Sequence, residues 1–183
     1  MRIISGSAKG HRLQTFKGLT VRPTSDRVRE SIFNMIGSST SGSKILDLFA
    51  GFGAMGLEAL SRGAEFVTFV EKSKRAADVI KTNLERLGFQ NGQVIPTDVY
   101  RFFRTAQKKE EGYDIVFADP PYKIFHEAWI GDLWLGVAEL LKAQGIFIVE
   151  HPSKWSPLSV ILTLQLSDSR KYGQTSVSFY KKL

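Results

Sequence analysis

Short apolar runs alternate along most of the chain with segments in which apolar residues recur every three or four positions. A short apolar run predicts a buried strand, and the longer spacing predicts an amphipathic helix. The predicted strands are residues 45–50, 66–71, 93–97, 113–118 and 145–150, and the predicted helices are residues 54–62, 73–87, 98–109 and 125–142. This alternation predicts a mostly parallel sheet with helices on both faces.

The C-terminal part of the chain departs from this pattern. Residues 160–166 and 175–181 are strand-like, and the four residues of 171–174 leave no room for a helix between them. We therefore expect the last two strands to form an antiparallel hairpin. The segment 150–155 after the fifth strand is also too short to hold a helix.

The N-terminal part is predicted to form a small extension. Residues 2–5 and 11–16 resemble two short strands, which predicts a hairpin, and apolar residues at helical spacing from Val28 to Ile36 predict a helix. A flexible connection is expected at residues 37–43, because they are rich in glycine and serine. We expect residues 1–37 to form a basic extension and residues 44–183 to form the main domain.

Composition narrows the possible chemistry of the 183-residue chain. It has no cysteine, and its three histidines lie far apart in the sequence, so we expect no metal site. No stretch approaches the roughly 20 apolar residues of a membrane span, and the chain starts without a signal-like segment. A monomeric cytoplasmic protein is the expectation.

Positive charge is concentrated near the N-terminus. The chain has a formal net charge of +7, and residues 1–30 hold seven basic side chains against two acidic ones, a local net charge of +5. Such a surface attracts phosphates, so nucleic acid is the expected partner, although a merely solvated basic face remains the alternative. The predicted nucleic-acid contacts are Arg2, Arg12, Arg22, Arg27 and Arg29.

The first predicted strand runs into a glycine-rich loop. Residues 51–56 match the pattern G-x-G-x-x-G between a strand and a helix, where backbone can approach a ligand closely. Glu71 ends the next strand, 20 positions after Gly51, where a carboxylate can accept hydrogen bonds from both ribose hydroxyls. These features favour a cofactor that contains ribose, with Gly51 and Gly53 beside it.

Two aspartates narrow the choice of cofactor. Asp47 would place a negative charge near the ligand, which favours a cationic amino-acid end over a pyrophosphate, and S-adenosylmethionine fits this description. Asp98 could accept from the adenine amino group, although either aspartate could instead be a loop or helix cap. Phe49, Lys72 and Val99 lie close to these residues in the sequence and are included in the predicted site. The predicted cofactor site is therefore Asp47, Phe49, Gly51, Gly53, Glu71, Lys72, Asp98 and Val99.

The fourth predicted strand ends in Asp119-Pro120-Pro121-Tyr122. Two consecutive prolines stiffen the loop, so the Asp119 carboxylate and the Pro120 carbonyl can accept both N–H bonds of an exocyclic amino group. Tyr122 offers a face on which a flipped base can stack. A rigid turn without a catalytic role is the alternative. We predict that Asp119, Pro120, Pro121 and Tyr122 form the catalytic site.

Together these motifs resemble those of the class I S-adenosylmethionine-dependent methyltransferases, and specifically those of the RsmD family of small-subunit rRNA guanine-N2 methyltransferases. The resemblance covers nearly the whole chain, and its segments are residues 2–6, 22–34, 46–63, 70–71 and 119–122. The arginine-rich segment 22–34 is the discriminating one, because the other motifs are shared among many enzymes that methylate amino groups.

The resemblance implies a Rossmann-like fold with a seven-stranded, mostly parallel sheet and an antiparallel last strand. It implies methyl transfer to the N2 amino group of a guanine in small-subunit (16S) rRNA, with that rRNA or an assembling 30S particle as the partner. The alternatives are adenine-N6 methylation of DNA, methylation of protein glutamine, a nicotinamide oxidoreductase and a non-catalytic ribosome-assembly factor.

Overall fold

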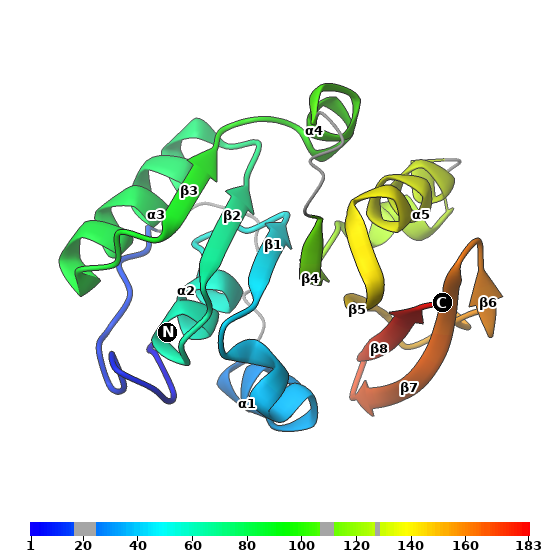
Figure 1. Ribbon diagram of the computed structural model, residues 1–183, viewed down its shortest axis with the longest axis horizontal. Helices are drawn as coiled ribbons and strands as arrows, with labels where there is room; N and C mark the ends of the chain where they lie inside the picture. The colour runs from blue at the N-terminus through cyan, green and yellow to red at the C-terminus, as the bar shows by residue number, and fades with distance from the viewer. Residues whose placement is uncertain (17–24, 107–111, 127–128) are drawn as a thin grey trace.

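The computed structural model describes residues 1–16, 25–106, 112–126 and 129–183, and these residues form one mixed sheet (Figure 1). The sheet has eight strands in the order β3-β2-β1-β4-β5-β8-β7-β6. The strands are β1 (Lys44–Leu48), β2 (Phe66–Val70), β3 (Gly92–Ile95), β4 (Tyr113–Ala118), β5 (Leu141–Pro152), β6 (Val160–Ile161), β7 (Leu164–Tyr172) and β8 (Thr175–Lys182).

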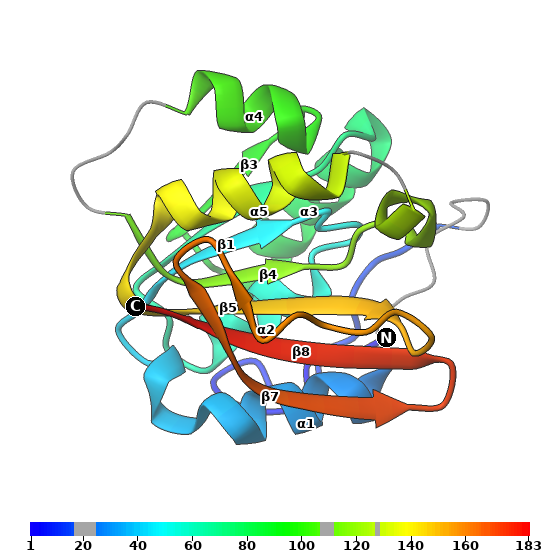
Figure 2. The same ribbon diagram turned by 90° about the vertical axis from the view of Figure 1, so that its right-hand side faces the viewer.

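Helices cover both faces of this sheet (Figures 1 and 2). Residues of α1, α2 and α3 share one hydrophobic core with one face, and residues of α4 and α5 share a second core with the other face. The helices are α1 (Asp26–Ile36), α2 (Ala54–Ser61), α3 (Lys74–Leu87), α4 (Val99–Thr105) and α5 (Trp129–Leu140), with the 3₁₀ turns η1 (Gly37–Thr40) and η2 (Tyr122–His126).

The directions of the strands confirm the predicted fold class. Strands β3, β2, β1, β4 and β5 are parallel, whereas β8 lies between β5 and β7 and is antiparallel to both. The final strand is therefore reversed, as the resemblance implied. The predicted strand 160–166 is divided in the structure between β6 and the start of β7, so the sheet has eight strands instead of seven, and β6 forms the edge beside β7.

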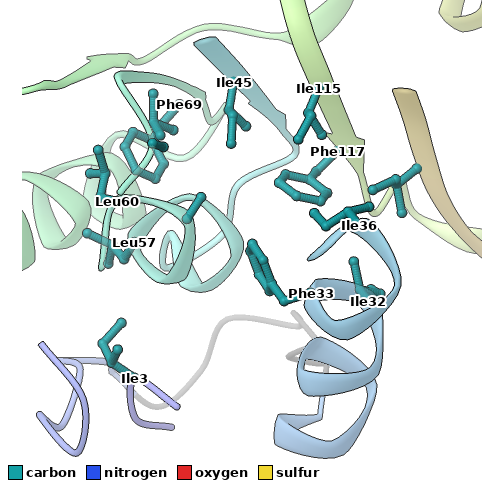
Figure 3. Packing of buried hydrophobic residues seen from close by; sticks show 14 of the residues in the cluster. Ile3, Ile32, Phe33, Ile36, Ile45, Leu57, Leu60, Phe69, Ile115 and Phe117 are labelled. Carbon is teal, nitrogen blue, oxygen red and sulfur yellow. The ribbon is translucent and has the colours of Figure 1, made fainter. Parts of the chain in front are cut away.

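Helix α1 covers the sheet where β4, β5 and β8 meet. Its apolar residues Ile32, Phe33 and Ile36 are almost completely buried, and the Phe33 ring lies 5.7 Å from the Phe117 ring of β4 (Figure 3). Ser25 caps the helix by accepting a hydrogen bond from the Val28 N–H at 3.3 Å. The N-terminal residue Ile3 is buried in the same core, so the described part of the extension packs on the main domain.

Three predicted local structures differ in detail. The predicted helix 125–142 ends at Leu140, because the chain enters β5 at Leu141 and passes through a positive φ of 63° at Gln144. The predicted N-terminal hairpin is reduced to one antiparallel bridge between Arg2 and Arg12. The connection expected to be flexible begins with the 3₁₀ turn η1 and continues with a Ser43 hydroxyl that donates to the Thr40 carbonyl at 2.7 Å.

A buried ion pair holds the N-terminal segment, α1 and α2 together. The Arg29 and Glu58 side chains are both fully buried, with Arg29 Nε 3.7 Å from Glu58 Oε2. Glu58 also accepts hydrogen bonds from the N–H groups of Ile4 and Ser5 at 2.7 and 3.0 Å, and from Arg62 Nε at 2.8 Å. Each oxygen of this buried carboxylate is therefore satisfied by more than one polar group.

This environment corrects the prediction that Arg29 contacts nucleic acid. Its guanidinium has no exposed surface, and Nη2 donates to the Arg2 carbonyl at 2.5 Å and to Asp26 at 3.1 Å. A buried side chain with these bonds cannot reach a phosphate, so Arg29 has a structural role.

The segment after β5 forms no helix, as predicted, and Trp155 covers the sheet instead. The Trp155 ring lies 5.1 Å from the Phe125 ring and 6.3 Å from the Trp134 ring of α5. No helix within the described ranges is long and apolar enough to cross a membrane. The described residues also contain no cluster of three or more His, Asp or Glu side chains arranged to hold a metal ion.

Replacing Arg29 with methionine should lower the free energy of unfolding by about 3 kcal/mol, because Glu58 would lose a buried counter-charge. Arg27→Met, an exposed substitution two residues earlier on α1, is the matched control and should change it by less than about 0.5 kcal/mol. Chemical denaturation measures both values, and equal stability of the two variants would contradict the structural role of Arg29.

Candidate active site

The two predicted functional loops lie side by side at one edge of the sheet. Strands β1 and β4 are parallel neighbours, with Leu48 paired to Ala118, so the loops that follow them start at the same edge. The chain moves outward from β1 to β2 and β3, and then returns to β4 on the other side of β1. Ligands of open α/β sheets bind at such a reversal of strand order.

The loop after β1 has an unusual backbone. Phe49 has a positive φ of 58°, which costs a non-glycine residue on the order of 1 kcal/mol, and Gly51 and Gly53 also have positive φ values. Gly53 is the N-cap of α2 at φ 80°, and a Cβ there would lie 3.1 Å from Ile80. The tight turn therefore brings the main chain of residues 49–53 to the N-terminus of α2.

Glu71 lies beside this loop at the end of β2. Its Oε2 accepts a hydrogen bond from the Gly51 N–H at 2.8 Å, and its Oε1 accepts one from the Ser73 N–H at 2.7 Å. Each carboxylate oxygen has two lone pairs, so these bonds leave acceptor capacity on both oxygens. The carboxylate is thus fixed next to the glycine loop, which fits a role in holding two vicinal hydroxyl groups.

Asp47 is a buried carboxyl group at the carboxyl end of β1. It accepts a hydrogen bond from the Gly56 N–H in the first turn of α2 at 3.0 Å. Burial raises its pKa from the ordinary 3.8 to about 7, the Gly56 bond opposes this rise, and the charge of Glu71 adds to it. A cationic group placed here would favour the ionised form of Asp47.

Asp98 caps helix α4, which is one of the two roles predicted for it. Its carboxylate accepts a hydrogen bond from the Tyr100 N–H at 3.0 Å, and Lys72 Nζ lies 3.5 Å from it. The Val99 side chain is buried in the core under α4, so contact with a ligand would involve mainly its backbone. Contact between these residues and adenine stays a prediction.

The Asp119-Pro120-Pro121-Tyr122 loop is braced by the C-terminal hairpin. The Tyr122 hydroxyl and the Thr175 hydroxyl at the start of β8 form a hydrogen bond, and the Pro121 carbonyl accepts from the Ile124 N–H at 3.0 Å. The Tyr122 side chain is 36% exposed, so a planar ring could stack against it.

Two adjoining cavities open at this edge. A small cavity of about 20 Å³ contains both Asp47 and Asp119, with Glu150 at the end of β5 beside them. A larger cavity of about 360 Å³ also contains Glu150 and is lined further by Ser25, Arg27, Val28, Lys171, Tyr172, Gly173 and Thr175. Asp47 and Asp119 therefore line one cavity and Arg27 lines the other, with Glu150 in the lining of both.

The sequence motifs gave no site role to Glu150, Lys171, Tyr172 and Thr175, which are among the residues that line these cavities. The position of Glu150 carried a usable signal, because it ends the predicted strand 145–150 just as Glu71 ends the predicted strand 66–71. The other three lie in the β7–β8 hairpin, and no local pattern indicated that this hairpin reaches the site.

The predicted nucleic-acid contacts differ in accessibility. Arg2, Arg12 and Arg27 are exposed, with Arg27 at the larger cavity and the other two joined by the N-terminal bridge. Arg22 lies outside the described residues, and Arg29 is buried as reported above.

The N-terminal segment also reaches the glycine-rich loop. The ring of Phe16 packs edge-on against the ring of Phe52 with 5.1 Å between their centroids, and Arg75 lies over the face of Phe16 at 3.9 Å. The basic extension and the glycine-rich loop are therefore in direct contact.

A doubly wound sheet with a reversed final strand, a glycine-rich loop after β1 and an Asp-Pro-Pro-Tyr loop after β4 define the class I methyltransferase fold. Comparisons with known proteins agree with this class. The solved structure of yhhF from Escherichia coli superimposes with a TM-score of 0.87 at 29% identity, covering 100% of this chain and 97% of that one.

Sequence comparisons define the family more narrowly. A family model described as "Conserved hypothetical protein 95" matches residues 1–181. YlbH from Bacillus subtilis is 40% identical over 185 residues, covering 100% of this chain and 99% of the relative. Ribosomal RNA small subunit methyltransferase D from Buchnera aphidicola is 32% identical over 175 residues, covering 90% and 88%. The chain belongs to this family, the RsmD family that its motifs indicated.

Asp47→Asn should become more stable relative to the wild type as pH rises from 5 to 8. The folded protein holds a proton on Asp47 up to a pKa of about 7, whereas the unfolded chain loses it near 3.8, so this group's contribution to stability falls as pH rises through that window. Asparagine carries no titrating proton at this position.

Thermal unfolding at pH 5 and pH 8 measures this effect, with the exposed α3 substitution Asp78→Asn as the control. A difference between Asp47→Asn and the wild type that is the same at both pH values would contradict the raised pKa.

Proposed function

We propose that this protein transfers a methyl group from S-adenosylmethionine to the exocyclic N2 amino group of a guanine in small-subunit rRNA. The observation that carries the proposal is the position of Asp119 beside Asp47 and the glycine-rich loop, at the point where strand order reverses. Family membership supports rRNA as the substrate, since relatives that match most of the chain are named small-subunit rRNA methyltransferases.

The proposed cofactor fits the residues at this edge. Asp47 would face the cationic amino-acid end, and Glu71 would accept from the ribose hydroxyls with its remaining lone pairs. The backbone of Phe49, Gly51 and Gly53 would lie along the ligand. Further contacts are proposed for Lys72, Asp98 and Val99 around the adenine ring.

The catalytic loop would activate the amino group by accepting its hydrogens. The nitrogen lone pair of guanine N2 is delocalised into the ring, so the group is a weak nucleophile. The Asp119 carboxylate and the Pro120 carbonyl would accept the two N–H bonds, localise the lone pair and hold nitrogen in line for attack. When bound, S-adenosylmethionine supplies a methyl group on a sulfonium that leaves as a neutral thioether. The amino group gains one N–C bond and releases one proton, and the Asp119 carboxylate would accept that proton.

Basic residues would bring the RNA to this loop. Arg27 lines the larger cavity next to Tyr122's partner Thr175, while Arg2 and Arg12 present a second basic area on the N-terminal segment. A flipped base that stacks on Tyr122 would then have its phosphates near Arg27.

Asp119→Ala should reduce turnover by at least about 100-fold and leave S-adenosylmethionine affinity within about threefold, because the carboxylate acts on the base rather than on the cofactor. Calorimetry measures binding, and a labelled-methyl assay on unmodified small subunits measures turnover. Loss of cofactor binding in this variant would contradict the assignment of Asp119 to the base.

Arg27→Ala should weaken RNA binding and reduce the slope of log affinity against log salt concentration by about one unit, the loss of one phosphate contact. Arg101→Ala is the matched control, because Arg101 is an exposed helical arginine on α4, at the opposite face of the sheet. A salt titration of binding compares the two variants. An unchanged slope for Arg27→Ala would mean that Arg27 is a solvated surface residue that does not contact RNA phosphate.

A further inference from the structure

Glu150 occupies the position beside Asp119 on the neighbouring strand. Strands β4 and β5 are parallel, and Ala118 pairs with Val149, so the next residues along the two strands are Asp119 and Glu150. Adjacent strands lie about 4.8 Å apart, which places the two main chains close together at the edge that holds the site.

Both carboxylates project from the same face of the sheet. Side chains alternate along a strand, and Phe117 and Ile148, two positions before Asp119 and Glu150, are buried in the core under α1. Ala118 and Val149 belong to the core on the opposite face. Asp119 and Glu150 accordingly line the same small cavity.

Glu150 also lines the larger cavity. The larger cavity contains Thr175, whose hydroxyl is bonded to Tyr122, and the basic residues Arg27 and Lys171. A base that stacks on Tyr122 and places its amino group at Asp119 would therefore have Glu150 next to the ring nitrogen beside that amino group. The two basic side chains offset the negative charge there and favour an approaching phosphate.

The edge of guanine matches two neighbouring carboxylates. Guanine has an N1–H donor directly beside its N2 amino group, so two donor groups face the same side of the base. Adenine has an unprotonated ring nitrogen, an acceptor, next to its amino group. A carboxylate beside Asp119 would bond to the N1–H of guanine and repel the corresponding lone pair of adenine.

We infer that Glu150 determines specificity for guanine by accepting a hydrogen bond from its N1–H while Asp119 holds the N2 amino group. This inference rests on the proposed function and adds the residue that selects guanine. It gives Glu150 a direct contact with the substrate, and it accounts for the carboxylate that lies beside Asp119 on the neighbouring strand.

The test uses 2-aminopurine, which keeps the amino group at position 2 but has a lone pair in place of the N1–H. Small subunits are reconstituted with rRNA that carries guanosine or 2-aminopurine riboside at the methylated position. Single-turnover methyl transfer to each is measured for the wild type and for Glu150→Gln. Glu65→Gln is the matched control, because Glu65 is exposed at the opposite end of the strands.

The wild type should prefer guanine by roughly 10- to 100-fold, the range expected for one hydrogen bond to a charged group. Glu150→Gln should reduce this preference at least 10-fold, because its amide can donate to the N1 lone pair of 2-aminopurine. Glu150→Ala should lower the rate on guanine and relieve the repulsion of the 2-aminopurine lone pair, so it should also reduce the preference, whereas Glu65→Gln should keep the wild-type preference.

The experiment distinguishes failure of the inference about Glu150 from failure of the proposed function. An unchanged preference in both Glu150 variants, with methylation of guanine by the wild type intact, would overturn the inference about Glu150 alone. Absence of N2 methylation by the wild type would overturn the proposed function on which it rests.

Discussion

The buried ion pair between Arg29 and Glu58 is the interaction that holds α1 and α2, the two helices beside the candidate site, in place. Glu58 lies on α2, the helix that begins at the glycine-rich loop, and Arg29 lies on α1, which carries Arg27 at the larger cavity. The same carboxylate holds the backbone of Ile4 and Ser5. One charge cluster therefore fixes the basic extension, the loop after β1 and the helix over β4 and β5 relative to one another.

The parallel strands bring the candidate catalytic and binding residues to one edge of the sheet. Asp47, Asp119 and Glu150 each sit at or just beyond the carboxyl end of a parallel strand, on the face covered by α1 and α2. Burial raises the pKa of Asp47, and a positively charged ligand group beside it would favour its ionised form. The reversed hairpin β7–β8 closes the site from the side through Thr175 and Tyr122. Cofactor loop and catalytic loop are thereby placed within one region.

Local sequence patterns were sufficient to predict most of the fold and the central part of the candidate site. The apolar runs located the parallel strands and the final hairpin, and the two loop motifs follow the strands that the structure places side by side. Charge alone misassigned Arg29, because its partner Glu58 is 29 positions away and burial of an arginine leaves no local pattern. Lys171, Tyr172 and Thr175 were missed for a similar reason, since only the insertion of β8 beside β5 brings the hairpin to the site.

The decisive measurement is methyl transfer from isotopically labelled S-adenosylmethionine, with unmodified small ribosomal subunits, their naked rRNA and DNA as parallel substrates. Nucleoside mass spectrometry then identifies the labelled product. The proposed function predicts labelled N2-methylguanosine from the ribosomal substrate and none from DNA. Labelled N6-methyladenine in DNA, or no labelled nucleoside from any substrate although the cofactor binds, would contradict it.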